Sequence, residues 1–192
     1  MIAGHFGFAA AVKGKETAAP LWGLMLACQW LDVVFVPLTA AGIEKIVPVA
    51  GTTGGYGDVV IYADYTHSLV GATLLSIILG ALFARYGRRT AIVIGLVSMS
   101  HWVLDILMHR QDMPILPGNA GNLPRLGFGL WRSHAASAVA ELVLVVLGTL
   151  LYARAARNVA GSDPALVKRA NLCTVLLGVT GVVVLGLSVA GL

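Results

Sequence analysis

Long apolar runs constrain this chain more than any other feature of its sequence. Five stretches, at about 18–41, 66–86, 90–108, 133–153 and 170–192, consist mainly of aliphatic side chains. A helix needs roughly 20 such residues to cross the hydrocarbon core of a bilayer. Charged residues make up only 11% of the chain, against about 25% in soluble domains. We therefore expect an all-α, polytopic membrane helix bundle of about five transmembrane helices, forming one domain over 1–192.

The segment 1–12 is apolar but too short to span a bilayer. No positive charge precedes its apolar stretch, so it differs from a standard signal peptide. We expect a short re-entrant or interfacial helix, whose ends must be surrounded by protein or by a water cavity. Two longer connections, 42–65 and 109–132, are rich in Gly and Pro. They are expected to be ordered caps or mobile lids over one face of the bundle.

The distribution of Lys and Arg predicts how the chain lies in the membrane. Cytoplasmic loops carry an excess of these residues. Nine of them flank the short connections and four lie on the other side, so we place the short loops in the cytoplasm and the long loops outside a plasma (inner) membrane. The sequence pI of about 9.3 then reflects topology. Membrane lipids are the expected partners, and nucleic acid is not.

Several ionisable residues lie inside the apolar runs, where each costs about 2.5–3.5 kcal/mol on insertion scales. Residues tolerated at such cost are functional candidates by default. With the orientation above, the ionisable residues of four different spans all fall in the outer half of the bilayer. Polar residues that served only helix packing would not be expected to share one level. The set is Asp32, His67, His101, Asp105, His109 and Glu141, with His5 in the N-terminal helix.

The third span carries His101, Asp105 and His109 at positions i, i+4 and i+8, which form one stripe on a helix. Imidazole and carboxylate are the usual Zn²⁺ ligands. The two histidines lie about 12 Å apart along the helix axis, too far for one ion. Asp105 lies between them and could bridge two ions. The sequence therefore predicts either a dinuclear site or one ion with a histidine outside its ligand set.

Catalytic and substrate-binding roles follow from the same set. Asp105 or Glu141 could act as general base. Arg110 and Arg132, outside the proposed site, could bind an anionic group such as phosphate or only lipid headgroups. The remaining polar residues are interpreted structurally: Ser68 as a capping or packing residue, Thr66 or Asp64 as a helix cap, Asp58 and Asp112 as solvated loop acids, His134 as a helix-end residue, and Cys28 and Cys173 as packing residues.

The order of these motifs resembles the bacterial membrane-bound metal-dependent hydrolases of the YdjM type. The matching elements are an early His5, Asp32 in the next apolar run, Thr66-His67-Ser68 opening a helix, and His101-x-x-x-Asp105-x-x-x-His109. That family is itself thought to be similar to zinc-dependent phospholipase C and P1 nuclease. The resemblance implies metal-ligand roles for His5, Asp32, His67, His101 and Asp105, and less directly for His109 and Glu141.

These observations predict a membrane-embedded metal-dependent hydrolase with one or two divalent ions, most readily Zn²⁺. Metal would activate water and stabilise charge on an ester or phosphoryl oxygen. A site at this depth favours a phospholipid or lipid-linked phosphate as substrate. Two alternatives stay open. Chains of acids and histidines also form relays in metal-ion or proton transporters, and the metal could instead stabilise a non-catalytic scaffold.

Overall fold

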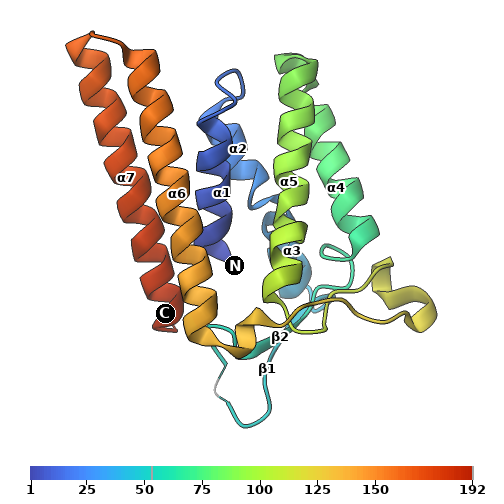
Figure 1. Ribbon diagram of the computed structural model, residues 1–192. Helices are drawn as coiled ribbons and strands as arrows, with labels where there is room; N and C mark the ends of the chain where they lie inside the picture. The colour runs from blue at the N-terminus through green and yellow to red at the C-terminus, as the bar shows by residue number, and fades with distance from the viewer. Residues whose placement is uncertain (53, 192) are drawn as a thin grey trace.

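The computed structural model describes residues 1–52 and 54–191, and it is mostly helical (Figure 1). Short 3₁₀ turns occur at Ala84–Tyr86, Pro117–Asn122 and Leu130–Arg132. The main elements are α1 Ile2–Lys13, α2 Leu21–Ala27, α3 Trp30–Ala40, β1 Lys45–Pro48, β2 Val59–Tyr62, α4 Leu69–Leu82, α5 Arg88–Met108, α6 His134–Ala160 and α7 Pro164–Val189.

Three helices, α5, α6 and α7, are long and apolar enough to cross a membrane. A fourth span exists if α2 and α3 are counted together, although they meet at a 47° bend. The expected number of about five spans is therefore not confirmed. The difference lies in the bent α2–α3 pair and in α4, which has 14 residues. At 1.5 Å per residue it rises about 21 Å, less than the roughly 30 Å of a hydrocarbon core.

The first predicted span, 18–41, is broken rather than continuous. α2 ends at Ala27, and Gln29 leaves helical geometry with φ −116° and ψ 6° before α3 begins at Trp30. At this break the carbonyl oxygen of Cys28 accepts a hydrogen bond from His101 Nδ1 at 2.7 Å. Irregular backbone at membrane depth is tolerated where protein surrounds it and satisfies its polar groups. The break therefore supplies an acceptor to α5 that a continuous helix would use internally.

The expectation of an all-α chain is wrong for the connection 42–65. β1 and β2 form an antiparallel pair in which Lys45 faces Tyr62 and Pro48 faces Val59. This hairpin lies with the connection 109–132 at one end of the bundle, and the short connections lie at the other end (Figure 1). Both long connections therefore cap one face of the bundle in the part of the chain that the structure describes.

α1 begins inside the bundle, beside α5 and α6, instead of at the end of the bundle (Figure 1). It packs along α6 through two glycines. A Cβ atom on Gly148 would lie 1.9 Å from the carbonyl oxygen of Gly7, and one on Gly7 would lie 2.5 Å from the backbone of Leu144. Small residues of this kind allow close approach of helices in membranes. The contact fixes α1 in depth, and with it His5.

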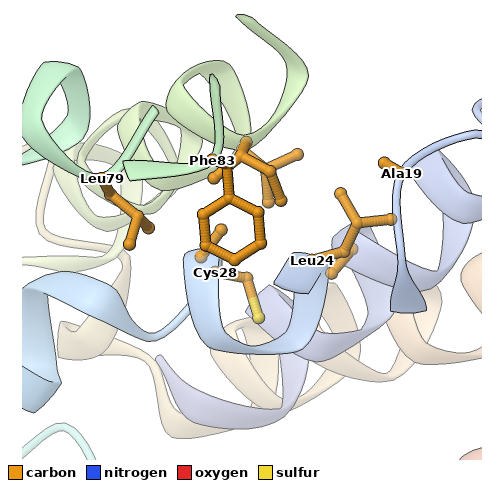
Figure 2. Packing of buried hydrophobic residues seen from close by; sticks show 9 residues of the cluster. Ala19, Leu24, Cys28, Leu79 and Phe83 are labelled. Carbon is orange, nitrogen blue, oxygen red and sulfur yellow. The ribbon is translucent and has the colours of Figure 1, made fainter. Parts of the chain in front are cut away.

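An apolar core lies toward the end that carries the short connections. Ala19, Leu24 and Cys28 from the α2 region pack against Leu79 and Phe83 of the α4 end (Figure 2). All five side chains are at most 5% exposed. This core ties the first half of the broken span to α4 and α5. It leaves α3, the second half, at the depth of the polar residues described next.

Candidate metal centre

The six predicted metal ligands lie together in the structure, although they come from four separate segments. His5 belongs to α1 and Asp32 to α3, His67 lies just before α4, and the remaining three follow one face of α5, with His109 as its C-cap residue. Every one except Asp32 is at most 3% exposed. The predicted convergence of imidazoles and carboxylates from separate segments is therefore present in the fold.

Asp105 is at the centre of this cluster. Its Oδ1 lies 3.0 Å from His5 Nε2. Its Oδ2 lies 3.1 Å from His101 Nε2, and 3.7 Å from the Nε2 atoms of both His67 and His109. All four histidines thus direct Nε2 toward one carboxylate group.

In two of the histidines, His101 and His109, the other ring nitrogen faces a group that can only accept a hydrogen bond. His101 Nδ1 faces the Cys28 carbonyl at 2.7 Å, and His109 Nδ1 faces the Asp112 carboxylate at 3.0 Å. A neutral imidazole carries a single hydrogen. With that hydrogen on Nδ1, bonded to these acceptors, the Nε2 atoms of both rings keep their lone pairs, which is the state in which histidine binds metal.

His67 reaches the same tautomer through a relay. Its Nδ1 lies 2.9 Å from Thr66 Oγ1, and the Thr66 hydroxyl donates its single hydrogen to Glu44 Oε2 at 2.9 Å. An ionised carboxylate only accepts hydrogen bonds, so the hydroxyl oxygen must accept from the His67 ring. The Nε2 atom of His67 is therefore also a lone pair, directed at the cluster.

Three of these atoms have the separations that a tetrahedral ion requires. His67 Nε2 and His101 Nε2 are 3.3 Å apart, and Asp32 Oδ1 lies 3.5 Å and 3.6 Å from them. Ligands about 2.0–2.1 Å from zinc lie about 3.3 Å from one another. With both Nε2 atoms unprotonated, two lone pairs and a carboxylate oxygen this close repel one another, and a cation between them would remove that repulsion.

A second group of metal-binding size consists of His5, His101 and Asp105. It shares His101 with the group of Asp32, His67 and His101. Because the Nδ1 hydrogen of His101 is bonded to Cys28, one Nε2 lone pair must serve both groups. His5 stacks on His101 with ring centroids 3.8 Å apart, and its Nδ1 has no hydrogen-bond partner among the described residues.

Asp32 is the exposed member of the cluster. Its side chain is 34% exposed, against 4% or less for the four histidines and Asp105. Its neighbours on the outer side of α3, Val33 and Val36, are 47% and 64% exposed. The cluster is therefore most exposed at Asp32, beside exposed apolar side chains of α3.

Two carboxylates that orient the histidines were not predicted to do so from the sequence. Glu44 is 1% exposed and accepts hydrogen bonds from the backbone N–H groups of Tyr65 and Thr66, both at 2.8 Å. Nothing in its sequence surroundings marks it. Asp112, expected to be solvated, is 2% exposed and also accepts from Ile61 N at 2.9 Å. Its i+3 spacing from His109 was the available signal.

Glu141 is buried beside the cluster but lies outside both metal-sized groups. Its carboxylate accepts from Gly4 N at 3.1 Å and from the Tyr56 hydroxyl at 2.9 Å. Burial, followed by the nearby Glu141 charge, raises the pKa of Tyr56, which keeps the phenol protonated as a donor. Glu141 thus holds the first turn of α1, which carries His5, and joins it to the loop before β2.

The two arginines proposed as substrate contacts have different surroundings. Arg110 donates to the Gly57 carbonyl at 2.9 Å and lies 3.7 Å from Asp58, which also pairs with His134 at 3.2 Å. Its guanidinium is thus part of the capping loop. Arg132 is exposed.

The helix start beside His67 also differs in part from the expectation. Ser68 caps α4 by accepting from Gly71 N at 3.0 Å, as expected of a capping residue. The alternative caps have other partners. Thr66 bonds to Glu44, and Asp64 forms an ion pair with Arg125 at 2.6 Å, which raises the pKa of Arg125. The cap places His67 directly before the helix, with its ring turned into the cluster.

Comparisons with protein-family models, with curated proteins and with solved structures found no match for this chain. The functional argument therefore depends on the geometry of the cluster.

Proposed function

We propose that this protein is a membrane-embedded metal-dependent hydrolase that acts on an ester or phosphodiester bond of an amphiphilic substrate. The observation that carries the proposal is the set of separations, 3.3–3.6 Å, among His67 Nε2, His101 Nε2 and Asp32 Oδ1. Three protein ligands with a fourth position left for water or substrate are typical of catalytic zinc sites, whereas structural sites have four.

The donor set fits a divalent ion of the zinc type. Two neutral imidazoles and one carboxylate match the ligands that Zn²⁺ prefers, and hard ions such as Mg²⁺ prefer all-oxygen sites. We propose one ion bound by Asp32, His67 and His101, since the second group needs the same His101 atom. When bound, it would supply a Lewis acid that polarises the scissile group and activates water.

Residues of the chain would accept the proton of the attacking water and hold the general base in position. Asp105 Oδ2, 3.1 Å from His101 Nε2, is placed to accept a proton from an attacking water as general base. His5 on Oδ1 and His109 near Oδ2 hold this carboxylate in position. The buried walls around it exclude bulk water, which strengthens electrostatic interactions within the site.

The substrate class follows from access. Asp32 is the exposed ligand and lies on a helix with exposed apolar side chains, so a lipid or lipid-linked phosphate would reach the site from the bilayer. We further propose that the end with the hairpin faces the outside of the plasma membrane, because the nine Lys and Arg residues of the other end favour the cytoplasm. The resemblance to membrane-bound metal-dependent hydrolases supports the same assignment.

Metal analysis and a hydrolysis screen test the proposal together. We expect purified protein to contain about one equivalent of zinc and to hydrolyse phospholipid or aryl phosphodiester substrates in proteoliposomes, with loss of activity after chelation and recovery with Zn²⁺. His101→Ala should lose both the metal and the hydrolysis.

A metal-free preparation would contradict the site. Bound metal without hydrolysis of any substrate would favour the scaffold interpretation. Zinc or proton flux across the proteoliposome membrane, without hydrolysis, would favour a transporter. Two equivalents of zinc would show that the group of His5, His101 and Asp105 is also filled.

A further inference from the structure

A second polar site lies at the opposite end of the bundle, far from the histidines. A cavity of about 320 Å³ opens between the C-terminal turn of α1, the end of α6 and the first half of α7. Lys13 and Arg169 line it together, and small side chains such as Ala156 and Ala160 form its wall. The cavity thus combines two cations with an apolar wall.

The Lys13 ammonium is held in place without any carboxylate. Its Nζ donates to the carbonyl oxygens of Thr17 at 2.7 Å and Ala19 at 2.8 Å, which uses two of its three hydrogens. Arg169 is exposed and pairs with no acid among the residues that the structure describes. The two positive charges on this cavity are therefore not neutralised within the described part of the protein.

The acids at this end of the bundle are engaged elsewhere. Glu16 forms a two-point ion pair with Arg89, at 2.6 Å and 2.9 Å. Asp163 caps α7 by accepting from the backbone N–H groups of Ala165 and Leu166. Nine Lys and Arg residues lie at this end against these two acids, so the local field attracts anions.

The surface around the cavity is apolar. Val159 is 71% exposed and Leu166 is 46% exposed, and both line the cavity; Leu172 and Leu176 continue along α7 at 57% and 56%. Helices α6 and α7 are both long and apolar enough to cross a membrane. A ligand here would therefore have an anionic head beside the two cations and hydrocarbon chains along the helices.

We propose that this cavity binds the headgroup of an anionic phospholipid. The phosphate would lie between Lys13 and Arg169, with its acyl chains along the exposed aliphatic side chains of α7. Basic pockets between membrane helices are suited to such headgroups. Positive charge that only sets topology would need no cavity and no convergence of two cations on it. The site shares no residue with the metal centre and is independent of the proposed hydrolysis.

Native mass spectrometry with defined lipids provides the test. Detergent-solubilised protein is titrated with phosphatidylglycerol or phosphatidylcholine, and the bound lipid is counted. We expect one phosphatidylglycerol to bind in preference to phosphatidylcholine. Arg169→Gln should weaken phosphatidylglycerol binding about fivefold, as expected for one cation near a headgroup. The matched control is Lys168→Gln, which removes the same charge one residue away, outside the cavity lining, and should change binding less than twofold.

Three results would overturn the proposal: equal losses in both variants, equal affinity for the two lipids, or displacement of the lipid by inorganic phosphate at equimolar concentration. The last would identify a site for free phosphate. If Arg169→Gln fails to fold, Lys13→Gln against Lys15→Gln repeats the comparison at the end of α1, because Lys15 does not line this cavity. The zinc content of each variant, measured in parallel, separates this site from the metal centre.

Discussion

Helices α5 and α7 are similar in length and apolar character, yet they have opposite places in the molecule. α5 has 21 residues and α7 has 26, and both could cross a membrane. α5 packs among α1, α2, α3 and α4, whereas α7 packs mainly on α6 and α1. Buried residues make up 39% of the most apolar window of α5 and 11% of that of α7.

The difference follows from the polar stripe on α5. His101 and Asp105 cost free energy at membrane depth unless other groups surround and compensate them, so the segments that carry those groups must lie around α5. α7 has no acidic, basic or histidine residue after Arg169 and requires no such neighbours. In lipid, burial of an apolar helix against protein gains little over burial in acyl chains. Polarity, and not hydrophobicity, thus identifies the central helix.

The largest effect is expected on α5 itself. Asp105→Asn should reduce the rate of hydrolysis by about 10²–10⁴-fold, because the amide cannot accept a proton as general base. Zinc content should stay close to one equivalent, since the proposed ligands Asp32, His67 and His101 are intact. Metal analysis and turnover on the same preparation check this. Loss of zinc with the activity would show that Asp105 is a ligand instead.

The next largest effect is expected for Glu44, which is connected through Thr66 to His67 beside α5. In Glu44→Gln the side-chain amide can donate to Thr66, so that the Thr66 hydroxyl turns its hydrogen toward His67 Nδ1. This forces the hydrogen of the His67 ring onto Nε2, where it blocks metal binding. Loss of such an orienting partner typically costs about 10–100-fold in metal affinity.

Competition with a chelator of known affinity measures that loss, and NMR of ¹⁵N-labelled histidine reports the tautomer. Glu44→Asp, which keeps the acceptor charge, should lose less affinity than Glu44→Gln. Unchanged zinc affinity in Glu44→Gln would contradict the relay.

A smaller effect is expected on α6, which lies between the two compared helices. Glu141→Gln removes the charged acceptor for Gly4 N and the Tyr56 hydroxyl, which should lower the free energy of unfolding by about 1–3 kcal/mol. Denaturant titration in detergent micelles measures it. Tyr56→Phe removes one of the two hydrogen bonds and should cost about half as much. If Glu141→Gln instead abolished turnover at unchanged stability, Glu141 would be the general base.

The smallest effect is expected on α7. Val182 is 50% exposed, so Val182→Ala should change the free energy of unfolding by less than about 0.5 kcal/mol and leave zinc content and turnover unaltered. The same three measurements apply. A large loss of stability would mean that this face of α7 is covered by another molecule, and the contrast between α5 and α7 would then be smaller than the isolated chain suggests.

Much of the site could be predicted from the sequence because an uncompensated ionisable group within a bilayer is costly, and both the residue type and its position along a predicted span can be read from the sequence. The stripe on α5 follows from helical periodicity, and the meeting of His5, Asp32 and His67 with it follows from their common level. Asp112 and Glu44 could not be placed in this way. Both lie in connections, where hydropathy carries no information about depth, and only the packing of the hairpin against the bundle buries them.

The sequence by itself determined that this chain is a bundle of apolar helices with one buried polar cluster, because apolar length and residue polarity are local properties. Only the tertiary structure decided that the first predicted span breaks at Gln29, that α4 has 14 residues, and which nitrogen of each histidine faces the cluster. Those features depend on contacts between residues far apart in the sequence, such as His101 to Cys28, 73 positions apart, and His5 to Asp105, 100 positions apart. Bonds of that kind exist only once the helices have packed.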